Sequence, residues 1–228
     1  MDETSGKMVA EIRDEDKQEI FFHVVDFNTR TLSEAFWVEK VDWWTTSLRL
    51  YYPYLLLEQY CDPQNPTKKT LLVYELEKQE IFAEVPGFQF EELVGTEVQG
   101  YDPQQQDIRK AVELTDLKTD LTEKNNLSNP VYYHPGTESY EMVAGYLNLD
   151  QKDVGCEYFE LEESIIISYY VRLGTKFERK LLVIKGDNEI YHNVVDKDLE
   201  GFASGGFFLL NDLVVFIENG YKINAIKI

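Results

Sequence analysis

Residues Leu71–Leu76 read LLVYEL and, after the polar turn Glu77–Gln79, residues Glu80–Ala83 read EIFA. Bulky side chains occupy successive positions of the first run, so they would lie on both faces of a β-strand. Burial on both faces is typical of parallel sheets, but parallel strands need connections of about a dozen residues or more. The short turn therefore predicts an antiparallel hairpin that is covered by further sheets on both of its faces.

The same pattern of an apolar run, a polar turn and a second apolar run occurs four times. The four copies are Phe21–Val38, Leu71–Ala83, Leu181–His192 and Leu213–Ile226. Their second runs begin 46, 109 and 33 positions apart, at Glu34, Glu80, Glu189 and Lys222. The first interval is close to the roughly 40–50 residues of a four-stranded blade. We therefore expect an all-β, β-propeller-like fold of about five irregular antiparallel blades, with a two-sheet β-sandwich or barrel as the alternative.

The length of 228 residues suits one large all-β domain or two small ones, and we expect a single propeller-like domain over residues 1–228. An irregular polar insertion near residues 95–129 interrupts the repeat. Within it, Ile108, Ala111 and Val112 are spaced as on one side of a helix, so we expect a short helix or a long loop there. Strands are expected to resume after the insertion, at residues 140–147 among others.

The first hairpin resembles those of quinoprotein-like and WD-like β-propeller repeats. In the quinoprotein-like repeat the pattern V-x-x-L-D-x-x-T-G-x-x-x-W recurs, and residues Val24–Arg30 (VVDFNTR), followed by Trp37, are the closest copy. The segments Tyr51–Val85 and Pro130–Pro135 look like an uncharacterised bacterial family of unknown function with propeller-like repeats. The turn glycine of the repeat is missing in the first two copies. The resemblance implies a fold but no activity, because propellers host enzymes, scaffolds and ligand binders.

The chain is strongly acidic, with 42 Asp and Glu residues against 22 Lys and Arg, which gives a net charge of −20. This charge disfavours nucleic acids and anionic membrane surfaces as partners. No apolar run is long enough to cross a bilayer, and the acidic N-terminus does not resemble a signal peptide, so we expect a cytoplasmic protein. We expect Cys61 and Cys156 to be free, buried thiols, although one disulfide bond between them remains open.

Familiar catalytic motifs are missing from the sequence, including GxSxG, GxxxxGK[ST], GxGxxG and HExxH. Residues Ser204–Gly206 lack the spacing of a nucleophile elbow and are interpreted as a turn. His23 and His192 fall inside expected strands, where packed histidines are commoner than catalytic ones. Carboxylate pairs arise by chance among so many acidic residues. We therefore expect no cofactor and no metal site.

Two aromatic segments are the candidate binding residues. Trp43 and Trp44 follow the first hairpin, and Tyr132, Tyr133 and His134 lie in an aromatic loop. Exposed aromatic side chains are suited to contact with a protein or a small-molecule ligand. Packing between sheets is the alternative interpretation of both segments.

Three functions remain open from the sequence, which does not establish what the protein does. We favour a non-catalytic interaction or ligand-binding module, with a protein or small molecule as its partner. The first alternative is a hydrolase or lyase that uses carboxylates and His134 in a cleft. The second alternative is a structural subunit of a larger assembly.

Overall fold

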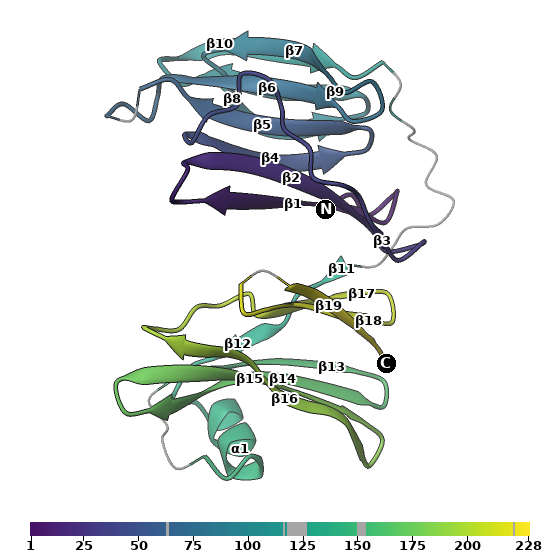
Figure 1. The fold of residues 1–228 in the computed structure, drawn as a ribbon, viewed down its shortest axis with the longest axis vertical. Coiled ribbons are helices and arrows are strands. Elements are labelled where there is room, and N and C mark those ends of the chain that lie inside the picture. The colour runs from purple at the N-terminus through teal and green to yellow at the C-terminus, as the bar shows by residue number, and fades with distance from the viewer. Residues whose placement is uncertain (63, 116, 118–126, 150–153, 221) are drawn as a thin grey trace. The chain divides into compact units, whose positions relative to one another are not determined.

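The computed structural model describes residues 1–62, 64–115, 117, 127–149, 154–220 and 222–228 (Figure 1). In this part of the chain the strands form five sheets, in which every pairing of neighbouring strands is antiparallel. The prediction of an all-β chain is confirmed. The chain divides into two compact units, Met1–Asn125 (unit 1) and Asn126–Ile228 (unit 2). The prediction of one domain over residues 1–228 stays a prediction.

Unit 1 contains three sheets that follow one another along the chain. The first is β1 (Lys7–Asp14), β2 (Glu19–Asp26) and β3 (Thr31–Leu32); the second is β4 (Thr45–Tyr51), β5 (Tyr54–Tyr60), β6 (Lys69–Glu75) and β7 (Glu80–Pro86); the third is β8 (Gln89–Val94), β9 (Glu97–Asp102) and β10 (Gln105–Glu113). Strands that are adjacent in sequence are also adjacent in each sheet, so each sheet is a simple meander (Figure 1).

The β4–β7 sheet is buried on both of its faces. On one face Leu57 and Leu72 pack in a cluster with Phe22 of the first sheet. On the other face Leu71 packs in a cluster with Phe88 and other residues of the third sheet region. Alternate residues of the LLVYEL run thus enter different cores, which confirms the stacked sheets expected from this stretch.

Unit 2 contains two sheets and one helix. The strands and helix are β11 (Leu127–Ser128), β12 (Val131–Tyr133), α1 (Glu138–Tyr146), β13 (Cys156–Leu161), β14 (Ser164–Leu173), β15 (Lys176–Lys185), β16 (Asn188–Leu199), β17 (Phe207–Leu210), β18 (Leu213–Glu218) and β19 (Lys222–Lys227). One sheet has the order β12-β13-β14-β15-β16, and the other has the order β11-β17-β18-β19.

A helix, rather than a sheet, covers one face of the β12–β16 sheet (Figure 1). Thr137 caps α1, because its side chain accepts a hydrogen bond from the backbone N–H of Tyr140. Tyr140, Val143 and Ala144 recur at helical spacing and pack against the sheet. The strand expected at residues 140–147 is therefore wrong.

The helix considered within the polar insertion is also wrong, because residues 105–113 form β10. Lys110, Val112 and Leu114 alternate with more exposed residues, which is the period of a strand. The spacing of Ile108, Ala111 and Val112 was compatible with a helix only because few apolar residues fall there. Residues 116 and 118–126 of the insertion lie outside the described residues.

The two units share one module, which consists of an antiparallel sheet and the three-stranded meander that follows it along the chain. In unit 1 Leu57 pairs with Leu72 between β5 and β6, and in unit 2 Ile167 pairs with Leu182 between β14 and β15. Both members of the pair shift by 110 positions, since 167 − 57 and 182 − 72 are equal. In each unit the sheet is followed by a three-stranded meander. The connection between them is residues 87–88 in unit 1 but residues 200–206 in unit 2.

Candidate functional site

A cleft of about 450 Å³ lies in unit 2 beside the longer of these connections. Its walls come from β14, β15, β16, the 200–206 connection and the β18–β19 hairpin; the lining residues are Tyr170, Arg179, Asp196, Leu199, Gly201, Phe202, Ala203, Ser204, Gly205, Gly206, Ile217 and Gly220. The volume falls within the roughly 300–1,000 Å³ of small-molecule sites.

Hydrogen bonds from the sheet hold the connection in place. Glu157 of β13 is buried, and its carboxylate accepts hydrogen bonds from the backbone N–H groups of Gly205 and Gly206, the latter at 2.8 Å. The Tyr170 hydroxyl donates to the carbonyl of Ala203 at 2.8 Å and accepts from its N–H at 3.1 Å. Hydrogen bonds to a charged acceptor are stronger than neutral ones, so this connection is fixed although it is long.

The floor of the cleft carries a paired charge. Arg179 is 8% exposed, and its Nε donates to Asp196 Oδ2 at 2.7 Å. The Nη2 of the same guanidinium donates to the carbonyl of Ile217 at 2.7 Å. A buried ion pair is favourable only when its remaining hydrogen-bonding groups also have partners. Arg179 finds such a partner in Ile217, so its guanidinium links β15, β16 and β18.

Gly206 leaves no room for a side chain. A Cβ atom there would lie 2.4 Å from Arg179 Nη1, 2.6 Å from Glu157 Oε2 and 2.7 Å from Ser168 Oγ. Ser168 Oγ is buried and has no hydrogen-bond partner among the described residues. A glycine at this position thus allows the backbone to approach three polar side chains of the sheet.

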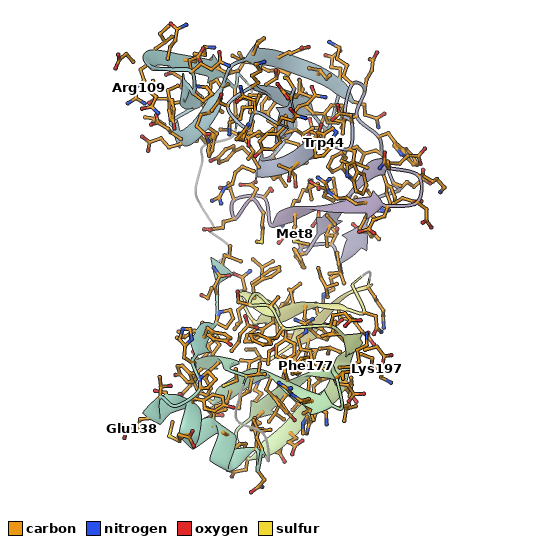
Figure 2. The ribbon with its side chains drawn as sticks, turned by 90° about the vertical axis from the view of Figure 1, so that its left-hand side faces the viewer. Met8, Trp44, Arg109, Glu138, Phe177 and Lys197 are labelled. Carbon is orange, nitrogen blue, oxygen red and sulfur yellow. The ribbon has the colours of Figure 1, made fainter. Side chains whose placement is uncertain are left out.

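An aromatic side chain stands at the mouth of the cleft. Phe202 is 54% exposed, and its ring centroid lies 6.1 Å from those of Tyr170 and Phe177. Phe177 of β15 is labelled in Figure 2, and the Arg172 guanidinium lies 4.8 Å from its ring centroid. Burial raises the pKa of Tyr170, so its hydroxyl is protonated at neutral pH. The exposed ring of Phe202 can pack on a ligand.

The sequence-predicted aromatic residues of unit 1 have different environments. Trp43 packs against the core between the first two sheets, with the Arg13 guanidinium 5.3 Å from its ring centroid. Trp44, labelled in Figure 2, is 50% exposed. Neither residue lines the cleft of unit 2.

The aromatic segment of unit 2 forms the corner before α1. Tyr133 stacks on Tyr158 with ring centroids 5.4 Å apart, and Tyr132 meets His134 edge-on at 4.9 Å. The His134 carbonyl accepts a hydrogen bond from the Thr137 hydroxyl at 2.8 Å. The structure brings these three predicted residues together, but they do not line the cleft. Whether they bind a ligand stays a prediction.

His192 is engaged by two neighbouring side chains. Its Nε2 lies 2.7 Å from the Tyr169 hydroxyl, and its Nδ1 lies 3.0 Å from Glu189 Oε2. Burial raises the pKa of Tyr169, which opposes formation of a tyrosinate nucleophile. The described residues contain no group of three or more His, Cys, Asp or Glu side chains suited to a metal ion.

A second hollow, of about 600 Å³, lies on the β8–β10 sheet of unit 1. Its charged residues include Arg109, which forms an ion pair with Glu91, and Lys110, which forms one with Asp102 at 3.1 Å. Arg109 and Glu91 are exposed, so water competes for both groups. The cleft of unit 2 is the stronger candidate, because buried side chains shape it.

Sequence reasoning missed the residues that build this cleft. Ser204–Gly206 were interpreted as a turn, and Glu157, Arg179 and Phe202 were not singled out. The signal that could have identified this site is the long connection at residues 200–206, which contains three glycines and lies between two apolar strands.

The family model described as a domain of unknown function (DUF4905) matches residues 1–82. These residues include β1–β6 and the start of β7, and they do not include the cleft. A search of curated proteins found no match to the chain. The comparisons thus assign no activity, and the function of the protein is unknown. Among the described residues, no helix has the length and apolar character required to cross a membrane.

Proposed function

We propose that this protein is a non-catalytic ligand-binding module whose site is the cleft beside residues 200–206. The observation that carries the proposal is a seven-residue connection that is fixed by Glu157 and Tyr170 yet leaves Phe202 54% exposed. An exposed aromatic ring on a rigid support loses little conformational freedom when it contacts a ligand.

The shared module shows that so long a connection is not needed for folding. In unit 1 the same connection is only Gly87 and Phe88, and Phe88 is buried in the core. The Lys110 ammonium holds this short connection by donating hydrogen bonds to the carbonyls of Pro86 and Gly87, at 2.6 and 2.7 Å. The additional residues in unit 2 therefore have a role other than joining two sheets, and binding is the role that their geometry supports.

The carboxylates near the cleft already have hydrogen-bond or ion-pair partners, which supports binding rather than catalysis. Glu157 accepts from two backbone N–H groups, and Asp196 pairs with Arg179, so neither carboxylate is poised to transfer a proton. The hydrolase or lyase near His134 and the structural subunit remain alternatives. Trp44 and Tyr132–His134 remain secondary candidates for contact with a partner.

A fragment screen by NMR would test the proposal. Fragments that bind should shift the backbone resonances of residues 199–206, and Phe202→Ala should abolish these shifts. Trp37→Ala is the matched control, because Trp37 is similarly exposed but lies in unit 1. Binding that persists in Phe202→Ala would contradict the proposal.

We also propose that the five sheets are the blades of one irregular propeller-like domain. Successive meanders and double-faced burial of the β4–β7 sheet support this arrangement. In the first and the last sheet, the face that points away from the sheet's own core is also apolar. On this face Met8, Ala10 and Ile12 alternate in β1, and Leu213, Val215 and Ile217 alternate in β18.

We further propose that the protein is bacterial and cytoplasmic. Two free cysteines support the cytoplasmic location.

A further inference from the structure

We infer that the ligand of this cleft is an uncharged saccharide. The inference rests on the proposed function, because it names the chemical class that the same cleft would bind. Three properties of the lining carry it: a neutralised floor, an exposed aromatic face, and a carboxylate oxygen that is available to hydroxyl groups.

The charges in and under the cleft disfavour ionic ligands. The guanidinium of Arg179 is neutralised by Asp196 at 2.7 Å, and the carboxylate of Glu157 lies directly beneath Gly205 and Gly206. A phosphate or carboxylate ligand would meet no unpaired cation among the lining residues, in a protein whose net charge is −20. A cationic ligand could reach Asp196 only beside the Arg179 guanidinium, and the two positive charges would repel each other. A neutral ligand avoids both costs.

The aromatic wall requires a ligand with an apolar face. The Phe202 ring is 54% exposed, and Leu199 and Ile217 add aliphatic surface to the lining. The glycines at positions 201 and 205 present backbone without side chains and have open space beside them, which leaves room for a flat ring. A pyranose has such a C–H face, and aromatic side chains bury it well.

The polar groups require hydroxyl groups around that face. Arg179 occupies Asp196 Oδ2, whereas Oδ1 accepts no hydrogen bond from the described residues. A purely apolar ligand would remove this oxygen from water without replacing its hydrogen bond, which is unfavourable. A sugar hydroxyl can donate to Asp196 and can also exchange hydrogen bonds with Ser204 at the same rim.

Titration of the full-length protein with defined probes would test the inference. The saccharide probes are cellotriose, maltotriose, mannotriose, xylotriose and N,N′,N″-triacetylchitotriose. Adenosine, N-acetyltryptophan amide and inorganic phosphate represent flat aromatic and anionic ligands. We expect at least one saccharide to bind with a dissociation constant in the millimolar range or tighter, and phosphate not to bind.

Variants would locate the binding. Phe202→Ala should weaken saccharide binding at least tenfold, whereas Phe202→Tyr should retain it, because both aromatic rings can stack on a sugar. Trp37→Ala should bind as the unmodified protein does, because Trp37 is exposed but lies in unit 1. Since Phe202 is exposed, its substitution should leave the thermal unfolding midpoint unchanged, which separates lost binding from lost folding.

The possible failures are distinguishable. If adenosine or N-acetyltryptophan amide binds in a Phe202-dependent way and no saccharide does, the saccharide assignment is wrong and the ligand-binding module stands. If a saccharide binds equally to Phe202→Ala, its site is elsewhere and the inference is overturned. If no probe of any class binds, both the inference and the proposed cleft are rejected.

Discussion

At the scale of single residues, Gly206 has the narrowest tolerance for substitution in the cleft. Gly206→Ala would drive a methyl group into Arg179, Glu157 and Ser168. We expect it to lower the free energy of unfolding by about 1–3 kcal/mol, as overpacked sites do. Gly201→Ala is the matched control, because a Cβ atom there meets nothing within 4 Å. Urea denaturation would measure both, and equal midpoints for the two variants would contradict the steric argument.

The two cysteines should differ sharply in reactivity. Burial, and to a smaller extent the charge of Glu157, raises the pKa of the Cys156 thiol to about 11, whereas Cys61 is exposed. The structure thus corrects the expectation that both thiols are buried. At pH 8 a disulfide reagent should titrate one thiol rapidly in the folded protein and the second only in denaturant. Rapid reaction of both thiols under native conditions would rule out this environment for Cys156.

Tyr158 should make stability depend on pH in the alkaline range. Burial raises its pKa to about 12, and the hydrogen bond that it donates to Glu160 acts in the same direction. An unfolded tyrosine ionises near pH 10, so between about pH 10 and 12 the folded state binds more protons than the unfolded state. The stabilisation is complete below pH 10 and is lost as the pH rises towards 12. Urea midpoints should therefore fall less between pH 9.5 and 11.5 in Tyr158→Phe than in the unmodified protein, and an identical fall would disprove the shift.

At the scale of elements, a buried ion pair links β5 to β6. Lys69 Nζ lies 3.0 Å from Glu58 Oε2, and both side chains are less than 10% exposed. Lys69→Met leaves a buried carboxylate unpaired and should cost about 3–5 kcal/mol. Adding Glu58→Gln should recover part of this loss, as measured in a double-mutant cycle of unfolding free energies.

A surface ion pair provides the control for this cycle. Lys40 lies 2.8 Å from Glu84 of β7, and both side chains are exposed. Lys40→Met should leave the urea midpoint nearly unchanged, because water screens the pair. If the losses in unfolding free energy caused by Glu58→Gln and Lys69→Met simply add up in the double variant, the buried pair does not act as a unit.

The sequence predicted the hairpins better than the elements between them. The runs that begin at Leu71, Leu181 and Leu213 are each followed by the expected second strand, because their apolar residues and short turns leave one pairing. In the first copy the strand expected at Glu34–Val38 is wrong: β3 lies earlier, at Thr31–Leu32, and Phe36 only bridges to Phe22. Helix α1 was missed because apolar residues recur at every second position from Tyr140 to Tyr146, which is the period of a strand.

The candidate site was less predictable than the fold. Its residues come from β13, β14, β15, β16, the β18–β19 hairpin and one connection, so only tertiary structure brings them together. Sequence reasoning favoured aromatic pairs, and these serve in part to pack the core near Trp43 and the corner near Tyr133. The exposed Phe202, by contrast, is a single aromatic residue among glycines, which has no distinctive pattern.

At the scale of the whole molecule, the proposal of one domain makes a calorimetric prediction. If residues 1–228 form one propeller-like domain, heating should give one transition whose calorimetric and van't Hoff enthalpies agree. Two separable transitions, one for each unit, would contradict it. The measurement also requires reversibility, which a second scan of the same sample would establish.

The pairing of β11 with β17 has a consequence for how the chain acquires its structure. Apart from this pair, the strand pairings of the described residues join strands that are consecutive in sequence, so most contacts are local. Such hairpins can form soon after synthesis, because little loop entropy is lost. Leu127 pairs with Leu210, which lies 83 positions later in the chain (210 − 127 = 83), so this contact must wait until Leu210 has been synthesised. The sheet that ends the chain is therefore the last to be completed, and β11 remains without its partner strand until then.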